Sequence, residues 1–163
     1  MAHVSLRGVE DDDLDAIFEM MREPDARRMA AFTAEHPDDR TEFNEWIVRH
    51  RDAPGVDMFV VTEDGGFAGT AALFTVDDDR EVTLWIAAHA WHRGVASEAL
   101  RLLVDREPAR PLYARVAAHN AAAVAVLEHA GFTEVSRSTT FAPGVGEDVD
   151  ELVYTLLPTL DGR

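Results

Sequence analysis

The stretch from Glu81 to Val104 constrains the fold more than any other part of this chain. Its sequence is EVTLWIAAHAWHRGVASEALRLLV. Its β-type apolar pattern predicts a strand over Glu81–Ala87, and apolar residues at helical spacing predict a helix from Gly94 onward. A strand that enters a helix through a short glycine turn is typical of proteins that pack helices on a sheet.

The other expected elements follow from periodicity, caps and turn residues. The predicted strands are Val4–Arg7, Met58–Thr62, Phe67–Phe74, Leu112–Ala117, Phe132–Phe141 and Glu151–Leu156. The predicted helices run from the acidic cap at Asp11–Asp13 to Pro24, over Ala26–Phe32, from Pro37 past His50, and over Asn120–Ala130. A hairpin turn is expected at Asp64-Gly65-Gly66, and a loop over Ala142–Asp150. With no repeat or linker, we expect a single domain over residues 1–163, of α/β class with helices on a mixed sheet.

The amino-acid composition argues against several classes of function. The chain has 31 acidic and 15 basic residues, for a formal net charge of -16, and all the basic residues are arginine. This charge disfavours binding to nucleic acid or to an anionic membrane. With no cysteine, disulfides, thiolate metal sites and a catalytic cysteine are excluded, and the seven histidines show no metal-ligand spacing.

The same features indicate a cytoplasmic protein without a cofactor metal. The first residues, MAHVSLRGVEDDD, lack the pattern of a signal peptide, and no apolar run is long enough to span a bilayer. The acidity itself has two interpretations. It is either a solvated surface or a means of attracting a cationic substrate.

The turn at Gly94 has the features of an anion site. Small residues at Gly94 and Ala96 allow a ligand to approach the backbone, and the first amides of a helix have no partner inside it. The helix dipole and Arg93 add a positive field that suits a pyrophosphate. The alternative is an ordinary turn between a strand and a helix.

Two motifs resemble those of the GNAT acetyltransferases. The run Ala88-His-Ala-Trp91-His-Arg-Gly94-Val-Ala96-Ser-Glu-Ala-Leu is similar to the acetyl-CoA loop of that family. It most resembles the branch that acetylates ribosomal-protein N-termini, where an aromatic residue holds the place of Trp91. A second run, from Asn120 to Gly131-Phe132, resembles the family's helix that opens with asparagine and ends in Gly-Phe. The resemblance implies a mixed, mostly antiparallel sheet of about six to seven strands, with helices on both faces.

The resemblance also implies roles for particular residues. The backbone of Trp85, Ile86 and Ala87 would bind the pantetheine arm of acetyl-CoA, and Asn120 would hydrogen-bond the same arm or simply cap its helix. The amides that would hold the pyrophosphate belong to His92, Arg93, Gly94, Val95, Ala96 and Ser97. No metal is implied, and homodimers occur among proteins that this chain resembles.

Acetyl transfer to an amine requires that the amine lose its proton. Glu81, at the start of the strand before the loop, is the first candidate for the base, unless it is a solvated strand-end acid. His89 and His119 are weaker candidates. The sequence departs from the family in having Leu127 in place of a common tyrosine, and Ala123 in place of a serine of the closest branch. These departures leave open a non-catalytic module that binds acyl-CoA. Tyr113 and Tyr154 are the only tyrosines that could serve as a general acid.

The acceptor is expected to be a primary amine on a cationic small molecule or a protein N-terminus. In the family, acceptor specificity lies in the segments that correspond here to Met21–Pro37 and Ser138–Asp150. Both segments are rich in acids that would favour a cation, namely Glu23, Asp25, Glu35, Glu147, Asp148 and Asp150.

Overall fold

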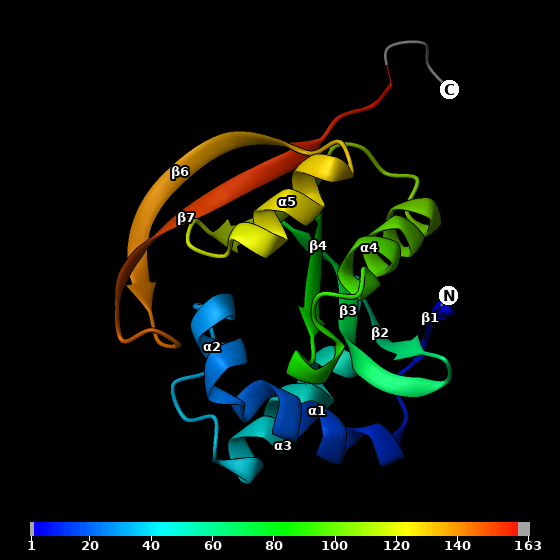
Figure 1. The fold of residues 1–163 in the computed structure, drawn as a ribbon, viewed down its shortest axis with the longest axis vertical. Helices are drawn as coiled ribbons and strands as arrows, with labels where there is room; N and C mark the ends of the chain where they lie inside the picture. The colour runs from blue at the N-terminus through cyan, green and yellow to red at the C-terminus, as the bar shows by residue number, and fades with distance from the viewer. Residues whose placement is uncertain (1, 160–163) are drawn as a thin grey trace.

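The computed structural model describes residues 2–159 and contains a seven-stranded sheet in the order β1-β2-β3-β4-β5-β7-β6 (Figure 1). The strands are β1 (Val4–Gly8), β2 (Val56–Glu63), β3 (Gly66–Val76), β4 (Asp79–Ile86), β5 (Leu112–Ala117), β6 (Thr133–Ala142) and β7 (Glu147–Leu156). The α-helices are α1 (Leu14–Arg22), α2 (Pro24–Ala30), α3 (Arg40–Arg51), α4 (Val95–Arg106) and α5 (Ala121–His129). Short 3-10 turns cover η1 (Asp11–Asp13) and η2 (Ala88–Ala90).

Helices cover both faces of the sheet, as expected. Helices α4 and α5 pack on one face through a core that includes Leu100, Leu103 and Leu127. On the other face α1 and α3 meet through Ile17, Phe18, Phe43 and Ile47. Figure 1 shows α4 and α5 in front of the central strands, and α1, α2 and α3 gathered below them. None of the helices within residues 2–159 is long and apolar enough to span a membrane.

The predicted starts of α3 and α5 are confirmed, whereas α2 begins at Pro24, two residues before the predicted Ala26. Glu23 caps α2 by accepting hydrogen bonds from the amides of Asp25 and Ala26, and Pro24 takes the first helical position. Asp39 caps α3, and Asn120 caps α5. These residues satisfy amides that a helix leaves unpaired at its start.

Strands β4 and β5 separate almost as soon as they meet. Every other neighbouring pair in the sheet is antiparallel, whereas β4 and β5 are parallel and pair only through Arg80↔Leu112 and Glu81↔Tyr113. Beyond this point β4 stays paired with β3, and β5 stays paired with β7 up to Ala117. Each strand therefore follows its antiparallel partner, and an opening forms between them.

The predicted loop over Ala142–Asp150 is wrong. The turn is only residues 143–146, because β7 begins at Glu147, which pairs with Ala142 of β6. Gly146 turns the chain with a φ of 87°. Acidic residues have low intrinsic strand propensity, but here pairing with β6 overrides it.

Candidate functional site

The end of β4 is shaped by an unusual turn. After η2, His92 has a φ of 64° and Gly94 a φ of 76°. Positive φ is uncommon for a residue other than glycine, and such outliers cluster at functional sites. The indole Nε1 of Trp91 donates a 2.7 Å hydrogen bond to the carbonyl oxygen of Ile86, which fixes the turn against the strand. Trp91 thus links the turn to the end of β4, a role that the sequence did not indicate.

The start of α4 presents unpaired amides. Gly94 is its N-cap and supplies no side-chain cap, and the first helical bond runs from the amide of Glu98 to the carbonyl of Gly94, 3.2 Å. A Cβ added at Gly94 would meet nothing within 4 Å, so the backbone there faces open space. The first amides of a helix attract anions, and His92, Arg93, Gly94 and Ser97 around the start of α4 are exposed.

Arg93 does not stand free beside these amides. Its guanidinium forms an ion pair with Glu63 at the end of β2, while half of its side chain stays exposed. Sequence reasoning missed this partner, which comes from a strand thirty residues earlier. The positive charge near the turn is therefore shared between Glu63 and any ligand.

Backbone groups of β4 line the opening towards β5. In an antiparallel pair, the N–H and C=O of one residue point to the same neighbour, and successive residues alternate. The amide of Ala87 bonds to β3 through Ala68, and the carbonyl of Trp85 faces Gly69 of β3. By alternation, the backbone of Leu84 and Ile86 is directed towards β5. Leu84 was not among the residues expected from the sequence.

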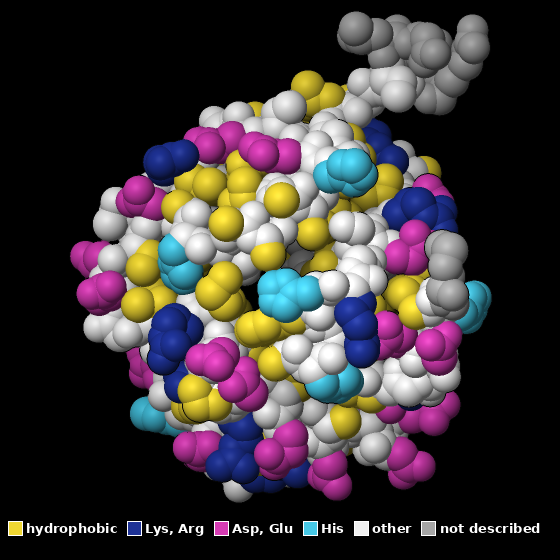
Figure 2. Space-filling view, viewed as in Figure 1, with side chains coloured by type: hydrophobic (Ala, Val, Ile, Leu, Met, Phe, Trp, Pro, Cys, Tyr) yellow, Lys and Arg dark blue, Asp and Glu magenta, His cyan; other side chains and the backbone are white. Residues whose placement is uncertain are grey.

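The molecular surface is hollowed near this region. Figure 2 shows a hollow in the middle of the face, at the place between α2, α5 and the end of β4 in Figure 1. Hydrophobic and histidine side chains border it, and acidic side chains lie mostly towards the edge of the view.

Glu81 lies where β4 and β5 part. Val82 and Ile86 of β4 belong to the α4 core, so alternation directs Glu81 to the opposite face of the sheet. Glu81 is 6% exposed and accepts a 3.1 Å hydrogen bond from Nε of Arg115 on β5. It is therefore a buried, paired acid, not the solvated strand-end acid that was the alternative.

The two candidate histidines bind backbone carbonyls. His89 Nε2 lies 3.1 Å from the oxygen of Phe67, and His119 Nε2 lies 2.7 Å from that of Arg28. Asn120 also bonds to α2, through its Nδ2 and the carbonyl of Met29, 3.2 Å, while its Oδ1 caps α5. These contacts give His119 and Asn120 structural roles in holding the end of α2 near β5.

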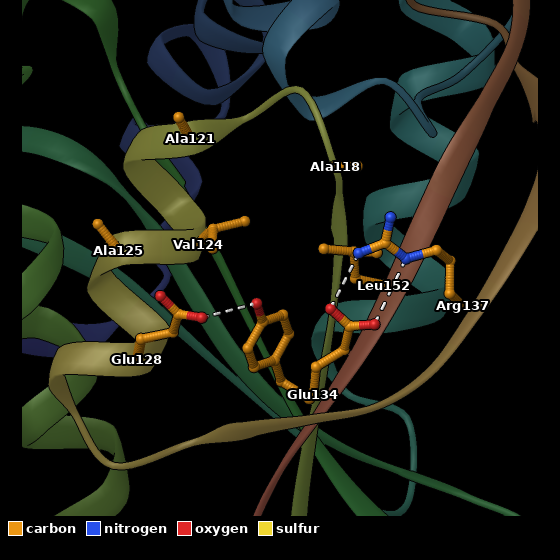
Figure 3. A pocket seen from close by; sticks show the side chains of 9 residues that line it. Ala118, Ala121, Val124, Ala125, Glu128, Glu134, Arg137 and Leu152 are labelled. Carbon is orange, nitrogen blue, oxygen red and sulfur yellow. Dashed lines mark hydrogen bonds and ion pairs between the residues drawn. The ribbon is translucent and has the colours of Figure 1, made fainter.

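The two tyrosines lie at different places. Tyr113 is opposite Glu81 in the β4–β5 register. Tyr154 hydrogen-bonds Glu128 of α5, 3.2 Å, and burial raises its phenol pKa, an effect that the bond to Glu128 increases. It lines a groove of about 440 Å³ between α5 and the β6–β7 hairpin (Figure 3). Leu127, in place of the family's common tyrosine, is buried in the core.

The two segments expected to bind the acceptor come together. The amide of Gly144 in the β6–β7 turn donates to the carbonyl of Ala31 after α2, 2.8 Å. Ala31 and Ala142 also pack with Ala117 at the end of β5. Several acids of these segments have structural partners, because Glu23 caps α2, Asp25 pairs with Arg28, and Asp150 accepts a bond from Thr139. Among residues 2–159, no group of acids and histidines is arranged to hold a metal ion.

We compared the chain with known protein families, sequences and structures. The profile of the acetyltransferase (GNAT) domain matches residues 3–133. The chain belongs to the GNAT acetyltransferase family. The resemblance seen in the two motifs is thus confirmed. A search of curated protein sequences finds no match.

Solved GNAT structures share the fold over nearly the whole chain. The spermidine N-acetyltransferase of Vibrio cholerae, in complex with CoA and spermine, is 21% identical with a TM-score of 0.78, over 93% of this chain and 95% of that one. The ribosomal-protein-alanine N-acetyltransferase of Brucella melitensis is 23% identical with a TM-score of 0.75, over 94% and 99%. A microcin C7 self-immunity acetyltransferase, in complex with acetyl-CoA and AMP, is 13% identical with a TM-score of 0.78, over 94% and 92%.

Proposed function

We propose that this protein is an N-acetyltransferase that moves the acetyl group of acetyl-CoA onto a primary amine by direct attack in a ternary complex. The observation that carries the proposal is the opening between β4 and β5 beside the uncapped start of α4. An elongated ligand with an anionic middle can place its phosphates at the amides and its arm along the free edge of β4.

The residues present fit acetyl-CoA. The amides of residues 92–97 would hold the pyrophosphate, with Arg93 and the hydroxyl of Ser97 beside them. Ile86 would bond the pantetheine arm through its N–H, with Trp85 and Ala87 shaping the strand around it. Asn120 uses one N–H of its amide for Met29, which leaves the second for the arm.

Glu81 is the group that we expect to accept the proton of the attacking amine. An α-amino group has a pKa of about 8 and a lysine-like amine about 10.4, so the amine must lose a proton before or during attack. Acetyl-CoA supplies the activated acyl group. Backbone N–H groups on the free edge of β4 can stabilise negative charge on the acyl oxygen.

Calorimetric titration of acetyl-CoA into the wild type and Gly94→Glu tests this site. The glutamate places an anion where we expect the pyrophosphate, so binding should be lost. Gly94→Ala is the matched control. It carries the same cost of placing a side chain on a left-handed backbone position, but it adds no charge. Failure of the folded wild type to bind acetyl-CoA would refute the proposal.

A second candidate function is a module that binds acyl-CoA without catalysis. It is favoured by Leu127 and Ala123, which supply no hydroxyl to protonate the leaving thiolate. Turnover across a panel of amines distinguishes the two. An enzyme should release CoA and lose this activity in Glu81→Gln, whereas a binding module should bind acetyl-CoA and release none.

We further propose a cationic acceptor, either a small polyamine or a protein N-terminus. Glu35, Glu147 and Asp148 are exposed acids in the two acceptor segments, and within residues 2–159 their carboxylates form no hydrogen bond or ion pair. Spermidine and ribosomal-protein-alanine acetyltransferases are among the similar structures. Comparing kcat/KM for spermidine with that for peptides with N-terminal alanine separates the two classes.

A homodimer and a cytoplasmic location complete the proposal. Strand β6 is an edge strand of ten residues, nine of them exposed, and it includes Val135 and Phe141 at 54% and 55% exposure. An exposed, unpaired edge strand of this length, with two exposed apolar side chains, favours pairing with a second strand. Sedimentation should show a dimer that Phe141→Glu weakens, and a monomeric wild type would refute the dimer.

A further inference from the structure

Arg115 is a charged residue in the middle of a buried strand. Its neighbours Ala114 and Val116 are buried in the core under α4 and α5, and Arg115 points to the other face of the sheet. Although its side chain is 48% exposed, Arg115 has ion-pair partners on that face. Arg115 has two, since Nε lies 3.1 Å from Oε1 of Glu81, and Nη1 lies 3.8 Å from Oε1 of Glu151 on β7.

The contact between Arg115 and Glu81 crosses the opening between the strands. The last residue of β5 that pairs with β4 is Tyr113, opposite Glu81. Arg115 lies two residues further along β5, where the strands have already parted, and its side chain reaches back to β4. The guanidinium therefore borders the opening on the face that carries Glu81.

Burial makes this contact important for Glu81. A buried carboxylate without a partner is strongly disfavoured as the charged form. Within residues 2–159, Arg115 is the one side chain found to hydrogen-bond Glu81, and its bond reaches only Oε1. Oε2 is left for another partner. A bidentate contact would occupy both oxygens. The single bond orients the carboxylate and leaves its second oxygen without a hydrogen bond from Arg115.

We propose that Arg115 is a positioning residue, which holds the Glu81 carboxylate at the β4–β5 opening with Oε2 free to take the proton of the acceptor amine. As the new N–C bond forms, the proton passes from the amine nitrogen to Oε2. The C–S bond of the thioester then breaks, CoA leaves as the thiolate, and Arg115 stays protonated throughout. Glu151 shares the guanidinium and keeps it from moving wholly into the opening. This inference rests on the proposed function.

Steady-state kinetics of four proteins test the inference: the wild type, Arg115→Met, Glu81→Gln and the double variant. A misplaced catalytic group commonly costs up to about a hundredfold in rate. Arg115→Met should therefore lower kcat roughly 10- to 100-fold, with the KM for acetyl-CoA changed by less than about twofold. Arg115→Lys should recover part of the lost kcat, because it keeps a cation near Glu81.

The double variant separates positioning from a general structural role. If Arg115 acts through Glu81, the double variant should be no slower than Glu81→Gln alone, because the two effects are not additive. Arg101→Met is the matched control. Arg101 lies on α4 with 57% of its side chain exposed, and its ion pairs within residues 2–159 are with acids of its own helix, so its loss should leave kcat unchanged.

The outcomes distinguish this inference from the proposed function. An active wild type with a fully active Arg115→Met would overturn the inference alone. So would strictly additive losses in the double variant, which would mean that Arg115 acts independently of Glu81. A folded wild type that acetylates none of the amines would overturn both.

Discussion

The charge of Arg93 is divided between an internal acid and the proposed ligand. Its guanidinium pairs with Glu63, and half of the arginine side chain is exposed. The Glu63 side chain is mostly buried, with 13% exposed, whereas the exposed half of Arg93 gives a phosphate access to the arginine. Glu63→Gln should release Arg93 and remove a nearby negative charge.

We therefore expect Glu63→Gln to bind acetyl-CoA about two- to fivefold more tightly than the wild type, measured by calorimetry at low salt. Glu134→Gln is the control, because it breaks a similar pair with Arg137 on the edge strand β6. Unchanged or weaker binding in Glu63→Gln would show that Arg93 does not contact the ligand.

Gly69 sets the position of the free edge of β4. A Cβ at Gly69 would lie 2.2 Å from the carbonyl oxygen of Trp85 and 2.9 Å from the Cα of Ile86. Both atoms are backbone, so they cannot turn aside as a flexible side chain would. Gly69→Ala should push the end of β4 away from β3, into the space proposed for the pantetheine arm.

The expected cost of Gly69→Ala is about 1–3 kcal/mol in the free energy of unfolding, together with weaker binding of acetyl-CoA. Urea denaturation and calorimetry measure the two effects. Gly66→Ala on the same strand is the control, since a Cβ there meets its nearest atom at 3.5 Å. Equal behaviour of the two variants would disprove the close approach of β3 and β4.

At the scale of elements, the first strand is tied to the first helix by an ion pair. Arg7 of β1 donates from both terminal nitrogens to Asp13, at 2.8 Å each, and Asp13 also accepts the amide of Glu10. The hydrogen bonds from Arg7 hold the pKa of Asp13 below its ordinary value, and the bond from Glu10 lowers it further. The folded state therefore favours the ionised form of Asp13.

The pH dependence follows from the sign of this shift. The unfolded chain takes up the proton first as pH falls, so the stabilisation is complete above the ordinary pKa of about 3.9 and is lost below it. Asp13→Asn should reduce the free energy of unfolding by about 2 kcal/mol at pH 7, and by less at pH 3. Urea denaturation at both values measures this, with the exposed Asp12→Asn as control. A constant difference would contradict the linkage.

Elements whose signals are local were predicted well from the sequence. Asp39 and Asn120 mark helix starts through contacts within a few residues, and the Asp64-Gly65 turn needs only its own backbone. Pro24 was expected to end the first helix, and it also opens α2. The start of β7 was wrong because Glu147–Asp150 become strand only through pairing with β6. No local preference of these residues indicates that pairing.

The same distinction applies to the site. The turn at Gly94 and the helix that follows it were predicted because their residues are contiguous. The partners of Arg93 and Glu81 come from β2 and β5, and the opening itself exists because β5 follows β7 rather than β4. One signal for Arg115 was present, namely a single charge between Ala114 and Val116 in an apolar strand. Its partner could be identified only once the strand order was known.

At the scale of the whole molecule, a protein with a net charge of -16 must bind an anionic substrate. The amides at the start of α4 act at contact distance, whereas the repulsion from the total charge acts over the Debye length. That length is about 30 Å at 0.01 M salt and about 8 Å at 0.15 M. Added salt should therefore weaken the repulsion during approach more than the contacts in the complex.

We expect the association rate of acetyl-CoA to rise between 0.01 and 0.15 M salt, with little change in the dissociation rate, when both are measured by stopped flow. Acetyl-pantetheine, which lacks the phosphates, is the matched control and should show no such rise. An association rate that falls with salt would mean that the field at Arg93 and the α4 amides dominates even at long range. In that case the surface acids would lie too far from the site to impede the ligand, and their role would be limited to the acceptor and to solubility.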